Sequence, residues 1–365
     1  MANLPDIRRR IRSVNNTRQI TRAMKLVSAA RLRRAQDRAL SGRPYEQRLA
    51  SLLKSLVTRT ETCDPKSGEP RHPLLAQRKE KNILLLVVSG DRGLAGAFNS
   101  NIVKAAVRFV NEKAGLGLGF SESLTEDGGA ERMQGPVQRI EVQAIGRKGR
   151  DFLRRRFPVC KPNARGRGIF LIEDRERAMN KVDPSRATEL SAQIIDRYSR
   201  GEIDAVYLAF NEFKSVISQR LVVDKVLPVG QITRPNRQQS EELTEEQQQR
   251  ALQAAKGTGA RLRAGDTRAT DERSPKLTAS KVDYIYEQSP EEIFKSLLPR
   301  YVAVQVSRTL LESVAAEHAA RMTAMDSATN NASEMNDSLT LAMDRARQAK
   351  ITKEIIEIVS GAAGQ

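Results

Sequence analysis

The glycines that follow the apolar run Asn82–Ser89 are the residues best placed to do chemistry. Gly90–Asn101 reads GDRGLAGAFNSN, and glycine N–H groups between a buried strand and a helix are able to cradle a phosphate. The spacing is G-x-x-G-x-x-G, which differs from the dinucleotide-binding G-x-G-x-x-G and from the P-loop G-x-x-x-x-G-K-[ST]. The sequence therefore favours a tight strand-to-helix turn, with a phosphate site as the alternative. Gly146–Gly149, after the next apolar run, has the same interpretation.

The histidines and cysteines do not form a recognisable site. His72 lies in a proline-rich stretch, and His318 stands next to Glu317 in a long helical stretch. Cys63 and Cys160 are far apart in the sequence and belong to no CxxC pair, which fits a reducing compartment. The sequence predicts no metal site, no nucleophile–base pair and no bound cofactor, so the chain is not expected to be catalytic on its own.

The stretches that must position these residues alternate between strand and helix. The run NILLLVVS at Asn82–Ser89 is typical of a strand buried on both faces. Alternation with helices predicts a Rossmann-like α/β domain with a largely parallel sheet. Further strands are expected at Arg139–Gly146 and Ile203–Phe210, a hairpin at Ser215–Pro228, and helices at residues 101–113, 148–157 and 185–199.

A long helix is predicted on each side of this α/β region. In the first, over residues 4–58, Leu4, Ile7, Ile11 and Val14 have the spacing of a coiled-coil seam, which is expected to continue after a phase shift through Ile20, Met24 and Val27. Ser41–Pro44 is expected to kink or interrupt this helix. The second helix is expected to start at Pro290, to break near Pro299 and to run on to Ser360.

The two helices are expected to pair antiparallel, but their lengths differ. About 40 residues before the expected kink span roughly 60 Å, whereas Arg300–Ser360 spans roughly 90 Å. The last 15 to 20 residues of the second helix should therefore extend beyond the pair. An apolar stripe lies on this extension, at Ile351, Ile355, Ile356, Ile358 and Val359. It has no expected cover within the chain, so we expect another protein to cover it.

The charge of the chain points to an acidic partner. The formal net charge is +18, and the aromatic content is only 4%. Residues 1–60 hold 15 Lys and Arg against 3 Asp and Glu. A basic coiled-coil nucleic-acid-binding protein is one alternative, although Arg8–Lys25 contains no aromatic residue for base stacking. A nucleotide-using enzyme is the other, and it depends on the glycine turn.

These features divide the chain into five segments. We expect an N-terminal long helix (1–60), a linker (61–80), an α/β domain (81–232) with an insertion loop (115–136), a mobile insertion (233–282), and a C-terminal long helix (283–365). No apolar run reaches the length of a membrane span.

Several segments resemble the γ subunits of F-type ATP synthases. They are Ile11–Gln36, Ser89–Asn99 and Ala346–Ala363, together with Asp283–Pro290 and Arg321–Ala332. The pattern I-T-x-E-x-x-E-x-x-x-G-A at Ile351–Ala362 is specific to that family. The resemblance covers nearly the whole chain except the two insertions. The chain starts at once with the family helix, which favours a bacterial source over an organelle precursor.

The resemblance implies a rotary shaft. In that family the paired helices pass through a ring of α and β subunits, and the α/β domain touches the ε subunit and the membrane c ring. Proton flow turns the c ring and the shaft, while ATP chemistry takes place on the β subunits. The resemblance thus implies a non-catalytic CF(1) subunit with no cofactor and no nucleic acid, peripheral to the cytoplasmic face of the bacterial inner membrane.

The resemblance also implies partner contacts at particular residues. Arg22, Met24 and Lys25 would face acidic loops of β. Polar contacts to the ring would come from Gln348, Thr352 and Glu354. Apolar contacts in the bearing of the ring would come from Ile351, Ile355, Ile358 and Val359. Tyr284 and Tyr286 would lie at the foot, on the side of ε and the c ring.

Overall fold

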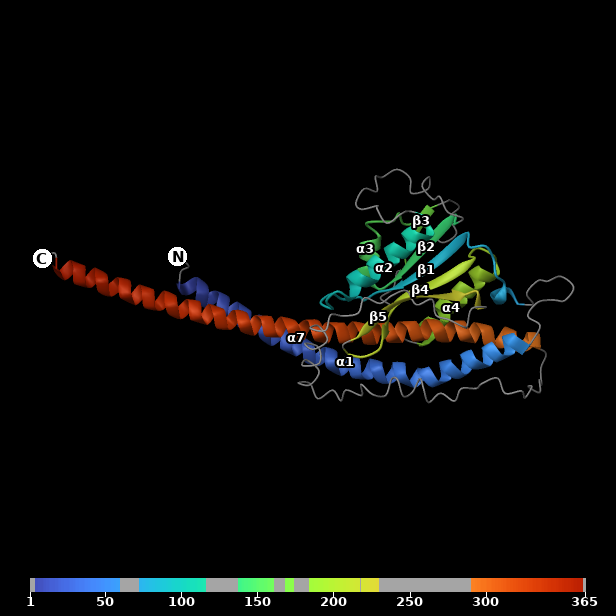
Figure 1. Ribbon diagram of the computed structural model, residues 1–365, viewed down its shortest axis with the longest axis horizontal. Coiled ribbons are helices and arrows are strands. Elements are labelled where there is room, and N and C mark those ends of the chain that lie inside the picture. Colours follow the sequence, from blue (N-terminus) through green and yellow to red (C-terminus); the bar gives the residue numbers. More distant parts are fainter. Residues whose placement is uncertain are drawn as a thin grey trace.

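Two long antiparallel helices and one α/β domain make up the protein (Figure 1). The computed structural model describes residues 4–59, 72–115, 137–160, 168–173, 184–216, 218–229 and 290–363. Helix α1 (Leu4–Arg59) and helix α7 (Pro290–Ala363) pair along the length of α1. The α/β domain packs on the other side of α7, so α7 lies between α1 and the sheet (Figure 1). The predicted combination of a two-helix coiled coil and an α/β domain is confirmed.

The seam of α1 keeps one heptad register from end to end. Its buried residues recur at spacings of three and four, or of sums of these, and are Ile7, Thr21, Ser28, Leu32, Ala35, Ala39, Glu46, Leu49, Leu53 and Leu56. The predicted phase shift is therefore wrong. Ile20 and Val27 are 60% and 53% exposed, while Thr21 and Lys25 face α7. Polar side chains occupy the seam here because α7 presents matching polar groups, Asp326 and Thr329.

Neither proline stops its helix. Pro44 lies inside α1 and Pro299 inside α7, and both helices continue through them. The predicted interruption at Ser41–Pro44 and the predicted break at Pro299 are therefore wrong, although α1 is visibly curved where it runs beside the α/β domain (Figure 1). An interior proline removes one backbone hydrogen bond. The packing of α1 against α7 offsets this loss, so each helix continues through its proline. The start of α7 at Pro290 is as predicted.

The sheet has five strands in the order β3-β2-β1-β4-β5. The strands are β1 (Asn82–Val88), β2 (Arg139–Ile145), β3 (Gly168–Glu173), β4 (Ala205–Phe213) and β5 (Gln219–Leu227). The first four are mutually parallel, and β5 returns antiparallel to β4. The largely parallel sheet is thus confirmed, but β3 was not predicted, because GIFLIE is short and begins with glycine.

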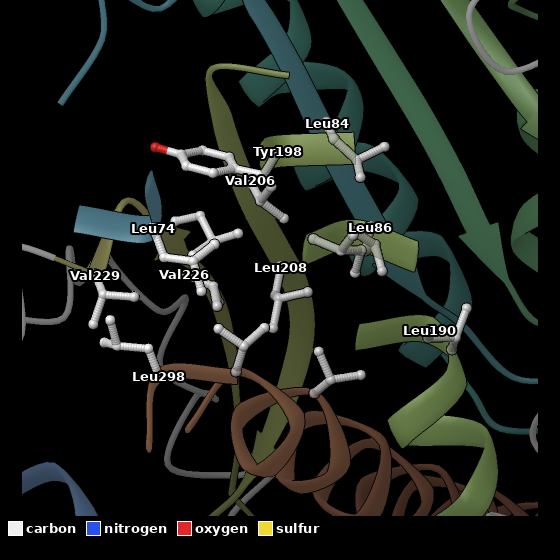
Figure 2. Close-up of a cluster of buried hydrophobic side chains, with 14 of the residues drawn as sticks. Leu74, Leu84, Leu86, Leu190, Tyr198, Val206, Leu208, Val226, Val229 and Leu298 are labelled. Atoms are coloured by element: carbon white, nitrogen blue, oxygen red, sulfur yellow. The ribbon is translucent and has the colours of Figure 1, made fainter. Parts of the chain in front are cut away.

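Helices cover both faces of the sheet. They are α2 (Phe98–Lys113), α3 (Arg147–Leu153) and α4 (Pro184–Ser199), and a short 3-10 turn, η1 (Pro73–Leu75), precedes β1. Alternate residues of β1 point to opposite faces: Ile83, Leu85 and Val87 pack beneath α2. Leu84, Leu86 and Val88 join the larger core, shared with α4, α1 and α7 (Figure 2). The buried strand predicted at this position is confirmed.

The expected insertions and part of the linker lie outside the described residues. These are residues 61–71, 116–136 and 233–282, and Tyr284 and Tyr286 lie outside them too. None of the described helices combines the length and the apolar character that a bilayer span requires.

Candidate partner surface of the shaft

Helix α7 continues well past the end of its pairing with α1. Thr21 Oγ1 lies 2.8 Å from Thr329 Oγ1, and Lys25 pairs with Asp326. Because the two helices are antiparallel, residue numbers rise along one as they fall along the other, and these contacts place Leu4 opposite residues 346–347. The described remainder of α7, about 16 residues or roughly 24 Å, has no partner helix (Figure 1). The extension predicted from the helix lengths is confirmed.

The apolar stripe on this extension is open to solvent. The exposed fractions are 46% for Ile351, 54% for Ile355, 71% for Ile358 and 61% for Val359. Every residue from Ile351 to Ser360 is exposed. Five large aliphatic side chains on one helix end, counting Ile356, form an apolar surface of the kind that marks an interaction site. We call Ile351–Val359 the tip.

The polar residues of the tip have weak partners on the same helix. Glu354 lies 3.6 Å from Lys350, and Glu357 lies 3.6 Å from Lys353. Both pairs are largely exposed. In each the lysine precedes the glutamate by four residues, which is the less favourable order on a helix, so the pairs stabilise the helix little. Gln348, Thr352 and Glu354 are all exposed. Their side chains project from the helix and are accessible to a partner.

The basic helix α1 carries a second exposed apolar surface. Ile20, Leu26 and Val27 are each more than half exposed, and Arg22 is exposed beside them. A heptad register continued without a break from Leu4 places Ile20 and Val27 outside the seam. Met24 is partly buried at the edge of the seam.

Lys25 departs from its neighbours. Its ammonium pairs with Asp326 inside the helix pair, where the two side chains are only 16% and 13% exposed. The charge of Lys25 is thus compensated within the pair of helices. The expected grouping of Lys25 with Arg22 as outward cations is not found in this structure, whereas Arg22 is exposed as that grouping required.

The glycine turn after β1 is filled by the protein's own side chains. Gly90 N–H donates to Asn99 Oδ1 at 2.9 Å, and a Cβ at Gly90 would lie 2.9 Å from the carboxyl carbon of Glu317. Arg321 pairs with Glu317 and donates to the carbonyl of Gly93 at 3.3 Å. A carboxylate therefore stands where a phosphate would have to approach. This geometry favours the turn over the phosphate site, and it ties the turn to α7.

The histidines take structural positions. His72 caps η1 by accepting from the Leu74 N–H at 3.2 Å. His318 lies 3.3 Å from Arg321, and burial, with the charges of Arg321 and Arg31, lowers its pKa to about 4. Among the described residues no group of His, Cys, Asp and Glu is arranged to hold a metal ion.

Comparisons with known proteins agree with one another. A family model described as ATP synthase matches residues 3–364. The chain is similar to an ATP synthase gamma chain of Solibacter usitatus, with 43% identity over 100% of this chain and 99% of that protein. It is also similar to an ATP synthase gamma chain of an Anaeromyxobacter species, with 41% identity over 99% of both proteins.

A solved structure shares the fold. A chain in the structure of the Euglena gracilis mitochondrial ATP synthase, "OSCP/F1/c-ring, rotational state 3", aligns with a TM-score of 0.50 and 16% identity. The alignment covers 99% of this chain and 94% of that chain.

Proposed function

Because the chain belongs to the family of ATP synthase γ chains, we propose that it is the central rotary shaft of a proton-translocating F-type ATP synthase. In this role it couples rotation of the membrane c ring to conformational change at the catalytic sites of the β subunits. It carries no catalytic site of its own and requires no cofactor.

The uncovered tip is the observation that carries this proposal. Ile351, Ile355 and Ile358 are exposed on a helix end that has no partner within the described residues. Burial of a side chain of this size is worth about 1.5–3 kcal/mol, so a surrounding apolar sleeve would stabilise the tip. A sleeve of α and β subunits around a single helix would leave the helix free to turn inside it.

The uneven surface of the shaft supplies what rotary coupling needs. Along its length the outer surface changes from the apolar tip to the basic part of α1, where Ile20 and Val27 are exposed near Arg22. A contact that is equal in all rotational positions shifts no equilibrium between conformations. A shaft with different faces contacts each β subunit differently, and so biases each catalytic site toward a different state.

The proposed contacts with the ring rest on the resemblance to the γ subunits, and the exposure of most of these side chains agrees with them. We assign Arg22 and Met24 to acidic loops of β, and Gln348, Thr352 and Glu354 to polar contacts near the upper shaft. The apolar tip, with Ile351, Ile355, Ile358 and Val359, is assigned to the bearing formed by α and β together. Lys25 contributes to this surface only indirectly, because it holds α1 to α7 through Asp326.

The α/β domain is assigned to the other end of the complex. We propose that it contacts the ε subunit and the c ring, with Tyr284 and Tyr286 on that side, and that the protein is peripheral to the cytoplasmic face of the bacterial inner membrane. The exposed basic residues of α1 then serve protein contacts and not a nucleic acid.

The experiment that tests the proposal uses the assembled catalytic complex containing this chain. The ring is fixed to a surface, a bead is attached to the α/β domain, and ATP is added. We expect stepwise rotation of the bead that stops when ATP is removed. ATP hydrolysis by the complex with a stationary, properly attached bead would contradict the rotary function.

A further inference from the structure

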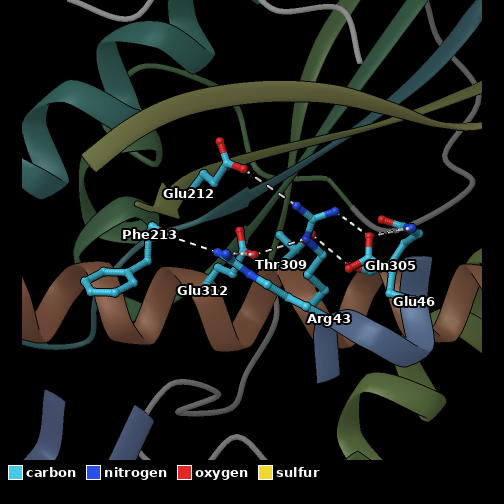
Figure 3. Close-up of polar contacts among 8 residues, drawn as sticks. Arg43, Glu46, Glu212, Phe213, Gln305, Thr309 and Glu312 are labelled. Carbon is cyan, nitrogen blue, oxygen red and sulfur yellow. Dashed lines mark hydrogen bonds and ion pairs between the residues drawn. The ribbon is translucent and has the colours of Figure 1, made fainter. Parts of the chain in front are cut away.

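Arg308 of α7 contacts all three parts of the molecule that meet at its position. Figure 3 shows its partners Glu46, Glu212 and Glu312 gathered there. Arg308 pairs with Glu46 of α1. Its Nη2 lies 3.6 Å from Glu212 Oε1 on β4, and its Nε lies 3.1 Å from Glu312 Oε1, one turn further along α7. One guanidinium group therefore connects the sheet, α7 and α1.

Arg43 of α1 makes the reciprocal set of contacts (Figure 3). Its Nη2 donates to Glu312 Oε1 of α7 at 3.3 Å and to the carbonyl of Phe213, the last residue of β4, at 3.1 Å. Gln305 of α7 adds a bond to Glu46 of α1 at 3.2 Å. We call Arg43, Glu46, Glu212, Arg308 and Glu312 the charged joint.

Burying the charges of the charged joint costs desolvation free energy. The side chain of Glu312 is 1% exposed and that of Glu46 is 9% exposed. Three carboxylates face two guanidinium groups, and burial raises the pKa of Glu312 against the opposing effect of Arg308 and Arg43. Apolar residues of similar volume at such sites often give equal or greater stability. The charged joint is therefore weak evidence for added stability, and its fixed geometry offers a different role.

The charged joint can fix the orientation of the sheet, α7 and α1 relative to one another. The apolar core between the sheet and α7 is held by the hydrophobic effect, which is non-directional and does not by itself fix the angle between them. A guanidinium group held by carboxylates has a fixed planar geometry. A turning force on the α/β domain displaces Glu212 and the Phe213 carbonyl, and through Arg308 and Arg43 it reaches α7 and α1 together.

We propose that the charged joint transmits torque between the α/β domain and both helices of the shaft, with Arg308 as the central positioning residue. This inference rests on the proposed rotary function. Without the charged joint, the domain twists further against the helices under the same torque, and the apolar core alone must transmit the motion of the c ring.

Two single substitutions in the complete ATP synthase in membrane vesicles test the inference. Glu212→Gln weakens the side-chain link to the sheet and leaves the contacts between α1 and α7 intact, whereas Arg308→Lys keeps the charge and removes the planar fork. The matched control is Asp196→Asn, which breaks an exposed 2.9 Å pair between Asp196 of α4 and Arg200, the residue that follows α4. We expect Arg308→Lys to lower proton pumping per ATP hydrolysed, because the bidentate geometry is lost, Glu212→Gln to lower it less, and the control to match wild type.

A four-residue variant separates torque from stability. Arg43→Met, Glu46→Met, Arg308→Met and Glu312→Met together remove two charges of each sign, so the net charge is unchanged. We expect this chain to unfold at a temperature no lower than wild type, but to pump fewer protons per ATP. With the ring fixed and a bead on the α/β domain, angular fluctuations should broaden in this variant and in Arg308→Lys.

The outcomes are distinct. Reduced pumping per ATP and broader fluctuations in assembled complexes of normal thermal stability support the charged joint. Wild-type pumping and fluctuations in both Arg308→Lys and the four-residue variant would overturn it, as would losses that appear only in proportion to lowered unfolding temperature. If the wild-type complex itself neither rotates nor pumps, the proposed rotary function fails, and not the assignment of the charged joint alone.

Discussion

Lys25 of α1 and Asp326 of α7 form an ion pair inside the two-helix seam, 301 residues apart in the sequence. The pair lies next to the hydrogen bond between Thr21 and Thr329. This part of the seam is therefore polar, while apolar residues such as Ile20 and Val27 point outward. The arrangement is the reverse of an ordinary coiled coil, and it leaves the apolar groups available for a partner.

Removal of one member of this pair should destabilise the chain. Asp326→Ala leaves the ammonium of Lys25 largely buried without its counter-ion, so we expect a loss of about 2–4 kcal/mol in the free energy of unfolding, measured with urea. The double substitution Lys25→Met and Asp326→Leu should recover most of this loss. The control Lys353→Ala breaks an exposed pair and should change stability by less than about 1 kcal/mol. An equal effect of Asp326→Ala and the control would mean that the seam pair is solvated.

Hydrogen exchange should distinguish the tip before and after assembly. An isolated helix end of this length is marginal in water, so the amides of Thr352–Ser360 should exchange fast in the free chain. In the assembled complex they should exchange slowly. Ala315–Ala319, buried against the α/β domain and α1, should be protected in both states and serves as the internal control. Equal exchange at the tip in both states would mean that no partner covers it.

Charges at the tip should weaken assembly. Ile355→Asp together with Ile358→Asp would force two carboxylates into the proposed apolar sleeve, and we expect much less complex on size-exclusion chromatography. Ile355→Ala or Ile358→Ala alone should be mild, at most about 1.5–3 kcal/mol, because a surface that must slide during rotation lacks a single deep pocket. The free double variant should keep its unfolding temperature. Normal assembly of the double variant would place the tip in contact with water.

Two glycines should respond to alanine in opposite directions. Gly146 has φ +103°, and a Cβ there would lie 2.0 Å from the carbonyl oxygen of Ser89, so Gly146→Ala should cost about 3 kcal/mol or more. Gly42 lies within α1, and a Cβ there would meet nothing within 4 Å. Gly42→Ala should therefore stabilise the chain by about 0.5–1 kcal/mol. Thermal unfolding of both variants checks the pair, and a loss with Gly42→Ala would show that α1 needs the glycine where it curves.

His318 should make the chain sensitive to mild acid. Burial, with Arg321 and Arg31 nearby, lowers its pKa from 6.5 to about 4 in the folded chain. Between pH 6.5 and about pH 4, His318 therefore binds a proton in the unfolded chain and not in the folded chain. The free energy of unfolding consequently falls as the pH drops through this range. His318→Gln should lessen this loss by about 1–2 kcal/mol, a figure reduced because the ring is partly exposed. Unfolding temperatures of both proteins at pH 8 and pH 5 provide the measurement, and identical differences would contradict the shift.

The sequence predicts those features that follow from a repeated pattern or from length. The continuous apolar run at β1 is typical of a strand covered on both sides, and the unequal lengths of the two helices predict an extension. The strand β3 escaped prediction because its six residues at the sheet edge carry little pattern of their own. The polar part of the seam could not be predicted from the apolar pattern of α1. Thr21 and Lys25 face inward because of long-range contacts with Thr329 and Asp326. The charged joint could not be predicted, since its members come from three distant segments.

The distance in sequence between α1 and α7 has a consequence for the newly made chain. On a ribosome, α1 emerges first, but its seam partner follows only after the whole α/β domain has been synthesised. Until then Leu32, Leu49 and Leu53, which the finished protein buries, have no α7 to pack against. Contacts across so long a loop form slowly, and exposed apolar surface in the meantime invites aggregation. The basic outer face of α1 would keep such nascent chains apart by mutual repulsion until the second helix arrives.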